Sequence, residues 1–367
     1  MTVYVALRDL KNARGRFVLM SVVIVLITFL VTFLASLTAG LAHESTSAVT
    51  DLDADHLAFS MPRPDDTPAF TASRVTADQW DAWTDVAGVE SAAPLGVATT
   101  RAESRTTTAS VTVLGVEQGS GMVPSTTADV APGTVVLTPA AAKELGASAG
   151  DVVTLGGSEL TVGTTVDSAA SFSHTPVVWT TLEDWQTVGA RGGDPAAGTV
   201  ATVVALTGSG LDDAAMTAAD ERIGTTTLTA SDARSAVSSF QGENTSLSTM
   251  QAFLLAISAL VVGAFFSVWT IGRTGDIAVL KALGASTRYL LRDALGQAAV
   301  LLVGGVAVGT LLTVGGAQLV PGDVPVVVTA ATTLVPAAAL IALGIAGAGI
   351  SVARITRVDP HAALAAR

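Results

Sequence analysis

The stretch FVLMSVVIVLITFLVTFLASLTAGLA, residues 17–42, decides the fold of this chain. It contains no Asp, Glu, Lys, Arg or His. It is also longer than the roughly 20 residues that a helix needs to cross about 30 Å of hydrocarbon. Three more charge-free stretches follow, at residues 245–272, 294–322 and 324–353. Buried helices of soluble proteins are rarely so long and so free of charge, so the sequence predicts four transmembrane helices.

The composition agrees with a membrane protein. Of the 367 residues, 50% are hydrophobic and 14% are charged, whereas soluble domains carry about 25% charged residues. Cysteine is absent, which excludes disulfides, zinc knuckles, iron–sulfur clusters and thiol catalysis. The formal charge of −12 argues against a nucleic-acid partner.

The distribution of charge predicts the orientation in the membrane. Residues 1–16, 273–293 and 354–367 together hold 11 basic and 4 acidic residues, and the rest of the chain holds 8 basic and 27 acidic residues. Lys and Arg concentrate on the cytoplasmic side of membrane helices. We therefore expect both termini and residues 273–293 in the cytoplasm, and the acidic residues 43–244 outside the cell. A cleaved signal peptide is the alternative at the N-terminus, but the apolar stretch is longer than a signal peptide requires.

These observations predict a membrane α-helical protein with an inserted extracytoplasmic α+β domain. The expected order is a cytoplasmic amphipathic helix (1–16), transmembrane helix 1 (17–42), an extracellular domain (43–244), transmembrane helix 2 (245–272), a cytoplasmic loop (273–293), transmembrane helices 3 (294–320) and 4 (324–353) and a cytoplasmic tail (354–367). Within the outer domain, alternation and turn residues predict strands at 110–116, 133–138, 151–155, 159–166, 175–180 and 199–206. Capping residues and apolar spacing predict helices at 76–86, 139–145, 217–223 and 231–240.

No catalytic or metal motif is visible. None of the three lysines lies in a phosphate-binding Gly-x-x-x-x-Gly-Lys-Ser/Thr sequence, and there is neither a His-Glu-x-x-His zinc motif nor a Gly-x-Ser-x-Gly nucleophile elbow. We therefore expect no catalytic residue, no metal site and no intrinsic cofactor. The expected role is that of a transport subunit without an ATPase site of its own.

The segment between the second and third spans carries the most specific pattern. Ile277, Leu280 and Leu283 fall on one helical face, Gly284 suits a helix C-terminus, and Ser286 suits the N-cap of the next helix. A short helix with one apolar face can dock into a groove of a partner protein. It can equally lie on the membrane surface, which the spacing alone leaves open.

This segment, DIAVLKALGAS at residues 276–286, resembles the signature of FtsX-like ABC transporter permeases of the MacB and LolC/LolE type. Asp276 stands where that family usually has Glu. Three other segments resemble the same family: ALRDLKNARGR (6–16), VVLTPAAAKELG (135–146) and the Asp-Pro-x-x-Ala-Leu ending within 353–364.

The resemblance implies a permease that works as a dimer of two copies of this chain with two separate ABC ATPase subunits. ATP would be bound by the ATPase and not by this chain, and the ATP-driven movement would pass to the membrane helices and the outer domain. The residues that the resemblance assigns to ATPase coupling are Asp276, Ile277, Leu280, Lys281, Leu283 and Gly284.

In size and layout the chain is most similar to the heme-exporter permeases of that family, the HrtB type, which makes heme the expected transported ligand. Ser36, Gly40 and Glu44 follow one another at a spacing of four residues on the first span, and His43 precedes Glu44. Small residues at this spacing allow close helix packing, either within one subunit or between two. In a dimer, these residues would form an apolar slot with carboxylates or imidazoles at its outer mouth, and its walls would be lined by Phe33, Leu37 and Leu41.

Several alternatives remain open at this stage. Glu44 can simply mark the point where the helix leaves the bilayer. The chain can be a regulatory FtsX-like permease that controls an extracellular cell-wall hydrolase, or an exporter of lipoproteins, peptides or antibiotics. Localisation in the cell membrane is common to all of these functions.

Overall fold

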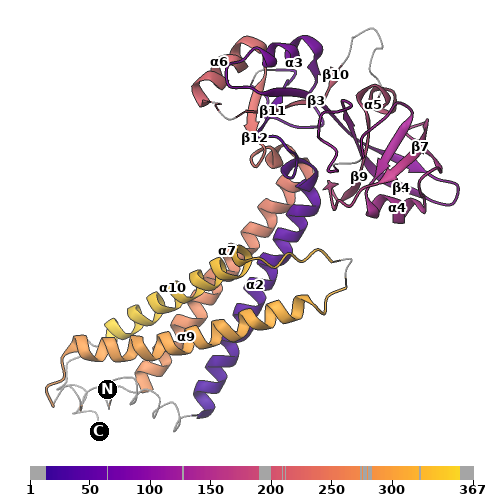
Figure 1. Cartoon of the computed structure of the whole chain (residues 1–367). Coiled ribbons are helices and arrows are strands. Elements are labelled where there is room, and N and C mark those ends of the chain that lie inside the picture. Colours follow the sequence, from indigo (N-terminus) through magenta and orange to yellow (C-terminus); the bar gives the residue numbers. More distant parts are fainter. Residues whose placement is uncertain are drawn as a thin grey trace. The chain divides into compact units, whose positions relative to one another are not determined.

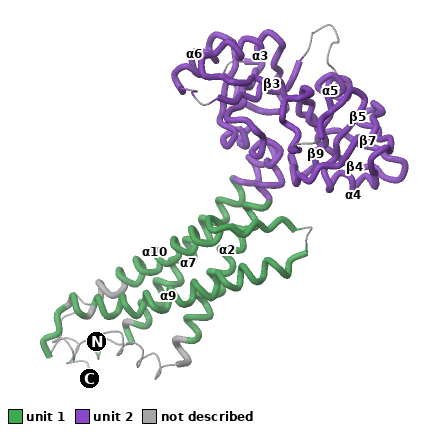
Figure 2. The backbone as a smooth tube through the Cα atoms, viewed as in Figure 1, with its two compact units in different colours: residues 1–40, 245–367 green, residues 41–244 purple. Residues whose placement is uncertain are grey.

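The computed structural model describes residues 14–355, except 64, 126–127, 190–199, 209, 211, 273–274, 276–278, 280–282 and 322–323. The chain forms two compact units (Figure 2). Residues 1–40 and 245–367 make the helical unit, and Leu41–Asn244 make the outer unit. The expected membrane α-helical fold with an inserted α+β domain is therefore confirmed.

The helical unit is built from four long helices (Figure 1): α2 (Arg14–Thr50), α7 (Ser238–Gly272), α9 (Thr287–Ala317) and α10 (Ala330–Ile355). The ends of two of them, residues 41–50 of α2 and 238–244 of α7, belong to the outer unit. Each of the four helices is long and apolar enough to cross a membrane. At 1.5 Å per residue, α2 is about 55 Å long, well beyond the hydrocarbon thickness. Helix α2 accordingly continues past the predicted end of the span at Ala42, and α7 begins before the predicted start at Thr245.

Small and polar residues bring the helices of this unit close together. A Cβ atom at Gly305 of α9 would lie 2.6 Å from the side chain of Ile24 in α2, and one at Gly309 would lie 2.6 Å from Thr28. One turn further, the hydroxyl groups of Thr32 and Thr313 are 2.6 Å apart in a buried hydrogen bond. In lipid the hydrophobic effect contributes little to helix association, so close van der Waals packing at small residues and hydrogen bonds between side chains hold helices together.

The connection between α9 and α10 packs against the outer half of α2. The backbone N–H of Val327 donates to the carbonyl of Ser36 at 3.0 Å. A Cβ atom at Gly40 would overlap the carbonyl oxygen of Pro325. The hydroxyl of Ser36 donates to Thr332 at 3.3 Å. The small residues Ser36 and Gly40 thus serve packing within one subunit.

The outer unit is built on a ten-stranded sheet in the order β12-β1-β11-β3-β4-β9-β5-β7-β6, with β8 paired to β9. A separate two-stranded sheet pairs β10 with β2. Most neighbours are antiparallel, but β4 pairs with β9, and β5 with β7, in parallel. The strands are β1 (His56–Phe59), β2 (Val75–Thr76), β3 (Ser91–Glu103), β4 (Thr108–Val116), β5 (Thr134–Leu137), β6 (Val152–Leu155), β7 (Ser158–Thr165), β8 (Ser171–Phe172), β9 (Thr175–Thr181), β10 (Val200–Ala201), β11 (Val203–Thr207) and β12 (Thr226–Thr229).

Both faces of the sheet are buried. Consecutive residues of a strand point to opposite faces, and Val113 and Leu114 accordingly belong to different apolar clusters, one around Trp83 and one around Trp179. The second cluster also contains Ala48 and Val49 from α2 and Phe240 from α7. The outer ends of these two helices are therefore anchored in the core of the outer unit.

Four short helices complete this unit: α3 (Ala77–Thr84), α4 (Pro139–Leu145), α5 (Leu182–Gly189) and α6 (Asp213–Ile223). Helix α5 places Trp185 against two glycines that lie opposite each other on neighbouring strands, Gly96 and Gly115. A Cβ atom at either glycine would overlap the Trp185 side chain. The missing side chains therefore provide the space that the indole occupies.

Most of the expected elements of the outer unit are confirmed. Strands lie at all six predicted positions, although the last is divided into β10 and β11. The predicted N-terminus of α4 is confirmed because Thr138 accepts a hydrogen bond from Ala141, and Gly146 ends the helix in a left-handed conformation. The stretch 231–240 is not one helix: a 3-10 helix (Ala233–Ala236) precedes the start of α7 at Ser238.

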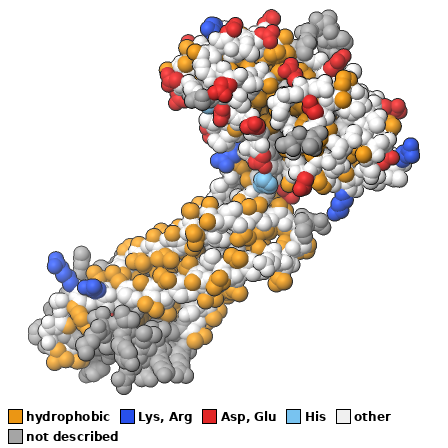
Figure 3. Space-filling view, viewed as in Figure 1, with side chains coloured by type: hydrophobic (Ala, Val, Ile, Leu, Met, Phe, Trp, Pro, Cys, Tyr) orange, Lys and Arg blue, Asp and Glu red, His pale blue; other side chains and the backbone are white. Residues whose placement is uncertain are grey.

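Charge is segregated as the sequence predicts. Figure 3 shows acidic side chains scattered over the outer unit and hydrophobic side chains along the long helices. The exposed large hydrophobic residues of α2 include Leu19, Val22, Leu26 and Leu30, which recur every three or four residues. Such a continuous apolar stripe suits contact with lipid or with another membrane helix.

Candidate functional site at the outer end of helix α2

The candidate ligand residues divide between two sides of α2. Phe33, Leu37, Leu41 and Glu44 are all half-buried and continue the stripe of exposed residues that begins at Leu19. With 3.6 residues per turn, these positions share one face of the helix. Ser36 and Gly40, in contrast, are buried against residues 325–332.

A carboxylate ends this stripe. The side chain of Glu44 is 44% exposed, and it follows a run of apolar side chains on the same helix face. His43 is exposed, but at the neighbouring position it points about 100° away from Glu44 around the helix. The structure therefore groups Glu44 with Phe33, Leu37 and Leu41, and it places His43 on another face.

A β-hairpin of the outer unit contacts α2 at Glu44. Strands β8 and β9 are joined by a two-residue turn, Ser173 and His174. Both turn residues have positive φ, +50° and +61°. Two-residue hairpin turns of this kind usually contain Asn and Gly, because side chains are disfavoured at positive φ.

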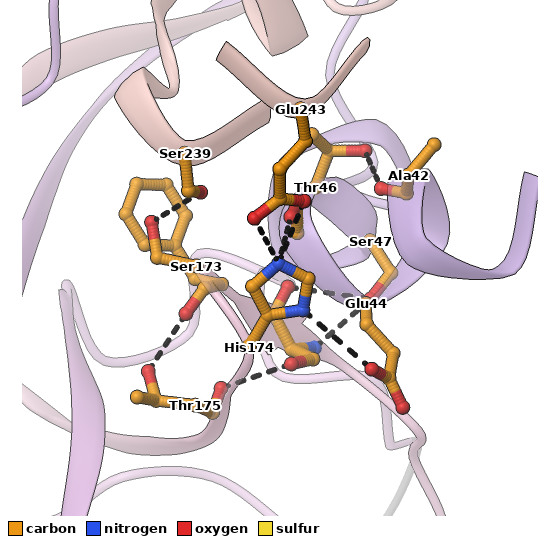
Figure 4. Close-up of polar contacts among 12 residues, drawn as sticks. Ala42, Glu44, Thr46, Ser47, Ser173, His174, Thr175, Ser239 and Glu243 are labelled. Carbon is orange, nitrogen blue, oxygen red and sulfur yellow. Dashed lines mark hydrogen bonds and ion pairs between the residues drawn. The ribbon is translucent and has the colours of Figure 1, made fainter. Parts of the chain in front are cut away.

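The imidazole ring of His174 lies between two carboxylates (Figure 4). Its Nε2 is 2.9 Å from both carboxylate oxygens of Glu243 on α7, and 2.8 Å from the hydroxyl of Ser45 on α2. Its Nδ1 is 3.6 Å from Oε2 of Glu44. A carboxylate can only accept, so a hydrogen on Nε2 donates to Glu243, and Nδ1 attracts the carboxylate of Glu44 when it also carries a hydrogen.

Serine hydroxyl groups and backbone amides extend the contact around this ring. The N–H groups of Ser173 and His174 donate to the carbonyls of Ser45 and Glu44, at 3.0 and 3.3 Å. The N–H of Ser171 donates to the hydroxyl of Ser47 at 2.9 Å, and Ser239 of α7 donates to Ser173 at 3.0 Å. The hairpin is thus bonded to both helices that enter the outer unit.

In this cluster the His174 ring lies between the carboxylates of Glu44 and Glu243 and does not gather them around one point. The two ring nitrogens of His174 face different carboxylates, so the three side chains do not converge on one point. In the part of the chain that the structure describes, no group of three or more His, Cys, Asp or Glu side chains could hold a metal ion. The partly exposed carboxylate of Glu44 remains available to a ligand that approaches along the apolar stripe.

Sequence reasoning missed His174 and Glu243 as neighbours of Glu44. Because they lie 130 and 199 positions further along the chain, no spacing rule connects them to the first span. The turn itself gives little signal, because Ser173 and His174 stand where a two-residue hairpin usually has Asn and Gly.

Most of the predicted coupling residues, namely Asp276, Ile277, Leu280 and Lys281, lie outside the described residues. Leu283 is 79% exposed, and Gly284 has a φ of +92°, in the left-handed region that favours glycine. Ser286 caps α9 by accepting a hydrogen bond from the N–H of Tyr289. The predicted cap at Ser286 is therefore confirmed.

Together, the fold and the site define an integral membrane protein whose long helices carry a large, β-rich extracytoplasmic domain. Residues 17–226 match the family model of the MacB-like periplasmic core domain, which is more than half of the chain. Residues 248–360 match the C-terminal domain of FtsX-like permeases. The chain therefore belongs to the FtsX/MacB-like family of ABC transporter permeases.

The chain is also similar to several individual proteins. An ABC transporter permease of Mycobacterium tuberculosis is 28% identical over 370 residues, which is 97% of both chains. A Staphylococcus epidermidis protein that is named as a hemin transport system permease protein, HrtB, is 30% identical over 141 residues. That match covers 38% of this chain and only 40% of the length of the relative. The periplasmic region of MacB from Actinobacillus actinomycetemcomitans aligns with a TM-score of 0.37 at 10% identity, over 50% of this chain and 92% of the other.

Proposed function

We propose that the chain is the permease subunit of an efflux transporter that removes heme from the membrane. The observation that carries this proposal is the position of Glu44, a partly exposed carboxylate at the outer end of an apolar stripe on α2. The stripe contains Phe33, Leu37 and Leu41. A ligand that is apolar over most of its surface and has one polar centre fits such a stripe.

Heme has this chemistry. Its macrocycle is flat and apolar, and its iron accepts axial ligands that include the oxygen of Tyr. A carboxylate is also an oxygen donor, so Glu44 is a suitable ligand for ferric heme. An ionisable residue at the end of a membrane span is a candidate functional residue because its burial near lipid is unfavourable. The name of the HrtB relative supports heme as the substrate.

The assembly that we propose is a dimer of this chain with two ATPase subunits. In a dimer, the exposed faces of two α2 helices would enclose the ligand between them, with Glu44 of each copy at the outer mouth. Both termini and residues 273–293 lie in the cytoplasm, where the basic residues concentrate. The chain has no intrinsic cofactor and no catalytic role, and ATP is bound by the partner.

A hemin titration tests the substrate. The purified chain in lipid nanodiscs is titrated with hemin while the Soret absorbance is followed. We expect saturable binding at micromolar hemin, weakened about tenfold or more by Glu44→Ala because an iron ligand is lost; tenfold corresponds to about 1.4 kcal/mol. Asp53→Ala is the matched control, because Asp53 is an exposed carboxylate just beyond α2.

Two results would count against heme. Absence of saturable binding at micromolar hemin would remove heme from the candidates, and equal affinity of Glu44→Ala and the unaltered chain would remove the site. Capture of a secreted cell-wall hydrolase by the outer unit, without any hemin binding, would favour the regulatory permease instead. The membership in the permease family is independent of this outcome.

A further inference from the structure

The turn between β8 and β9 carries an unusual backbone conformation beside Glu44. Among the residues that the structure describes, Ser173 and His174 are the only ones other than glycine with a positive φ. Such residues persist where the surrounding contacts over-determine the conformation, and they cluster at functional sites.

The contacts of His174 all lead to the two helices that enter the outer unit. One ring nitrogen faces Glu243 of α7 and the other faces Glu44 of α2. The side chain of His174 is 31% exposed, that of Glu243 is 39% exposed and that of Glu44 is 44% exposed. The ring is thus the most protected of the three, and it separates two carboxylates that would otherwise repel each other.

The ring also limits the freedom of the Glu44 side chain. A Glu side chain on a helix surface samples several rotamers, and fixing one of them before a ligand arrives improves the affinity. Groups that hold a ligating side chain from behind typically change the affinity for the bound metal by 10- to 100-fold. His174 contacts Glu44 in this way, and Glu243 in turn contacts His174.

We propose that His174 is a positioning residue: it holds the carboxylate of Glu44 in the orientation that receives heme, and Glu243 of α7 holds the imidazole. This inference rests on the proposed function, because it assigns Glu44 to the ligand. It adds that the site on α2 depends on the turn between β8 and β9 and on Glu243 of α7.

The variant His174→Gly tests the positioning role of the imidazole without straining the backbone of the turn. His174→Gly removes the imidazole and at the same time relieves the backbone, because glycine readily adopts a positive φ. We expect about tenfold weaker hemin binding in the nanodisc titration, with an unfolding temperature equal to or above that of the unaltered chain. Ser173→Gly is the matched control: it relieves the neighbouring position and keeps the imidazole, so hemin affinity should stay within about twofold.

Two further substitutions, His174→Asn and His174→Gln, test which ring nitrogen of His174 is needed for hemin binding. The side-chain amide of Asn can place its nitrogen near the position of the imidazole Nδ1, toward Glu44, and Asn also tolerates a positive φ. The longer amide of Gln can place its nitrogen near the position of Nε2, toward Glu243. We expect His174→Asn to restore hemin affinity to within about threefold of the unaltered chain, and His174→Gln to bind as weakly as His174→Gly.

The possible results separate this inference from the proposed function. If Glu44→Ala binds hemin as the unaltered chain does, the proposed site fails, and the positioning role fails with it. If Glu44→Ala weakens binding but His174→Gly does not, only the positioning role is overturned. Equal restoration by Asn and Gln, or equal loss in Ser173→Gly and His174→Gly, would also overturn it, because the turn and not the contact with Glu44 would then be responsible.

Discussion

Gly40 shows how one missing side chain shapes the first span. A Cβ atom there would overlap the carbonyl oxygen of Pro325, in the connection between α9 and α10. We predict that Gly40→Ala destabilises the protein by about 1–3 kcal/mol, the usual effect of adding a methyl group to a closely packed site. The measurement is the unfolding temperature of the purified chain in detergent.

Gly304 provides the comparison for this substitution. It lies on α9 with nothing within 4 Å of an added Cβ atom. Gly304→Ala should leave the unfolding temperature unchanged or raise it slightly, because Ala is the better helix former. Equal losses at both positions would mean that the close approach of Pro325 to Gly40 does not contribute to stability.

For single residues, the sequence shows which side chains stand out by their chemistry, but it does not show which residues they contact in the fold. Glu44 stands out because it is an acid at the end of an apolar stretch, and Ser286 stands out because it precedes a helix. The spacing of Ser36 and Gly40 predicts close packing, but no local pattern identifies Pro325 as the partner of Gly40 or His174 as the partner of Glu44. Both depend on tertiary packing between segments that are distant in the sequence.

At the scale of elements, long apolar helices and strongly alternating strands are predicted well, and β3 is not. Strand β3 contains Pro94 and Gly96, which normally argue against a central strand. Its pairing with β11 and β4, together with the space that Gly96 leaves for Trp185, overrides these local preferences. Helix α5 was missed for a related reason, since its first turn follows β9 directly and no loop marks its start.

The predicted helix around Leu280 can be tested for its contact with the ATPase. Leu280→Asp would place a charge on the expected apolar face, and a charge is unfavourable where a partner groove excludes water. We predict that the altered chain still inserts into the membrane but no longer copurifies with its ATPase. Val152→Asp is the control, because Val152 is an exposed apolar residue of the outer unit. Normal copurification and turnover of Leu280→Asp would refute the assignment of this helix.

At the scale of the whole molecule, the orientation can be tested directly because the chain has no native cysteine. We predict that a membrane-impermeant maleimide labels Ala149→Cys in intact cells, since Ala149 is exposed in the outer unit. It should label Leu283→Cys, which replaces a side chain that is 79% exposed, only after the cells are permeabilised. The reverse pattern would place the outer unit in the cytoplasm.

The pairing of β1 sets the order in which the protein can be made. Strand β1 directly follows α2, but both of its partners, β11 and β12, come near the end of the outer unit. The sheet therefore cannot close until residues 226–229 have crossed the membrane, and such long-range pairing is slow. Until then the secreted segment waits as unpaired, apolar strands, which are prone to aggregate. The outer unit is therefore open to aggregation and proteolysis until β12 is available to pair with β1.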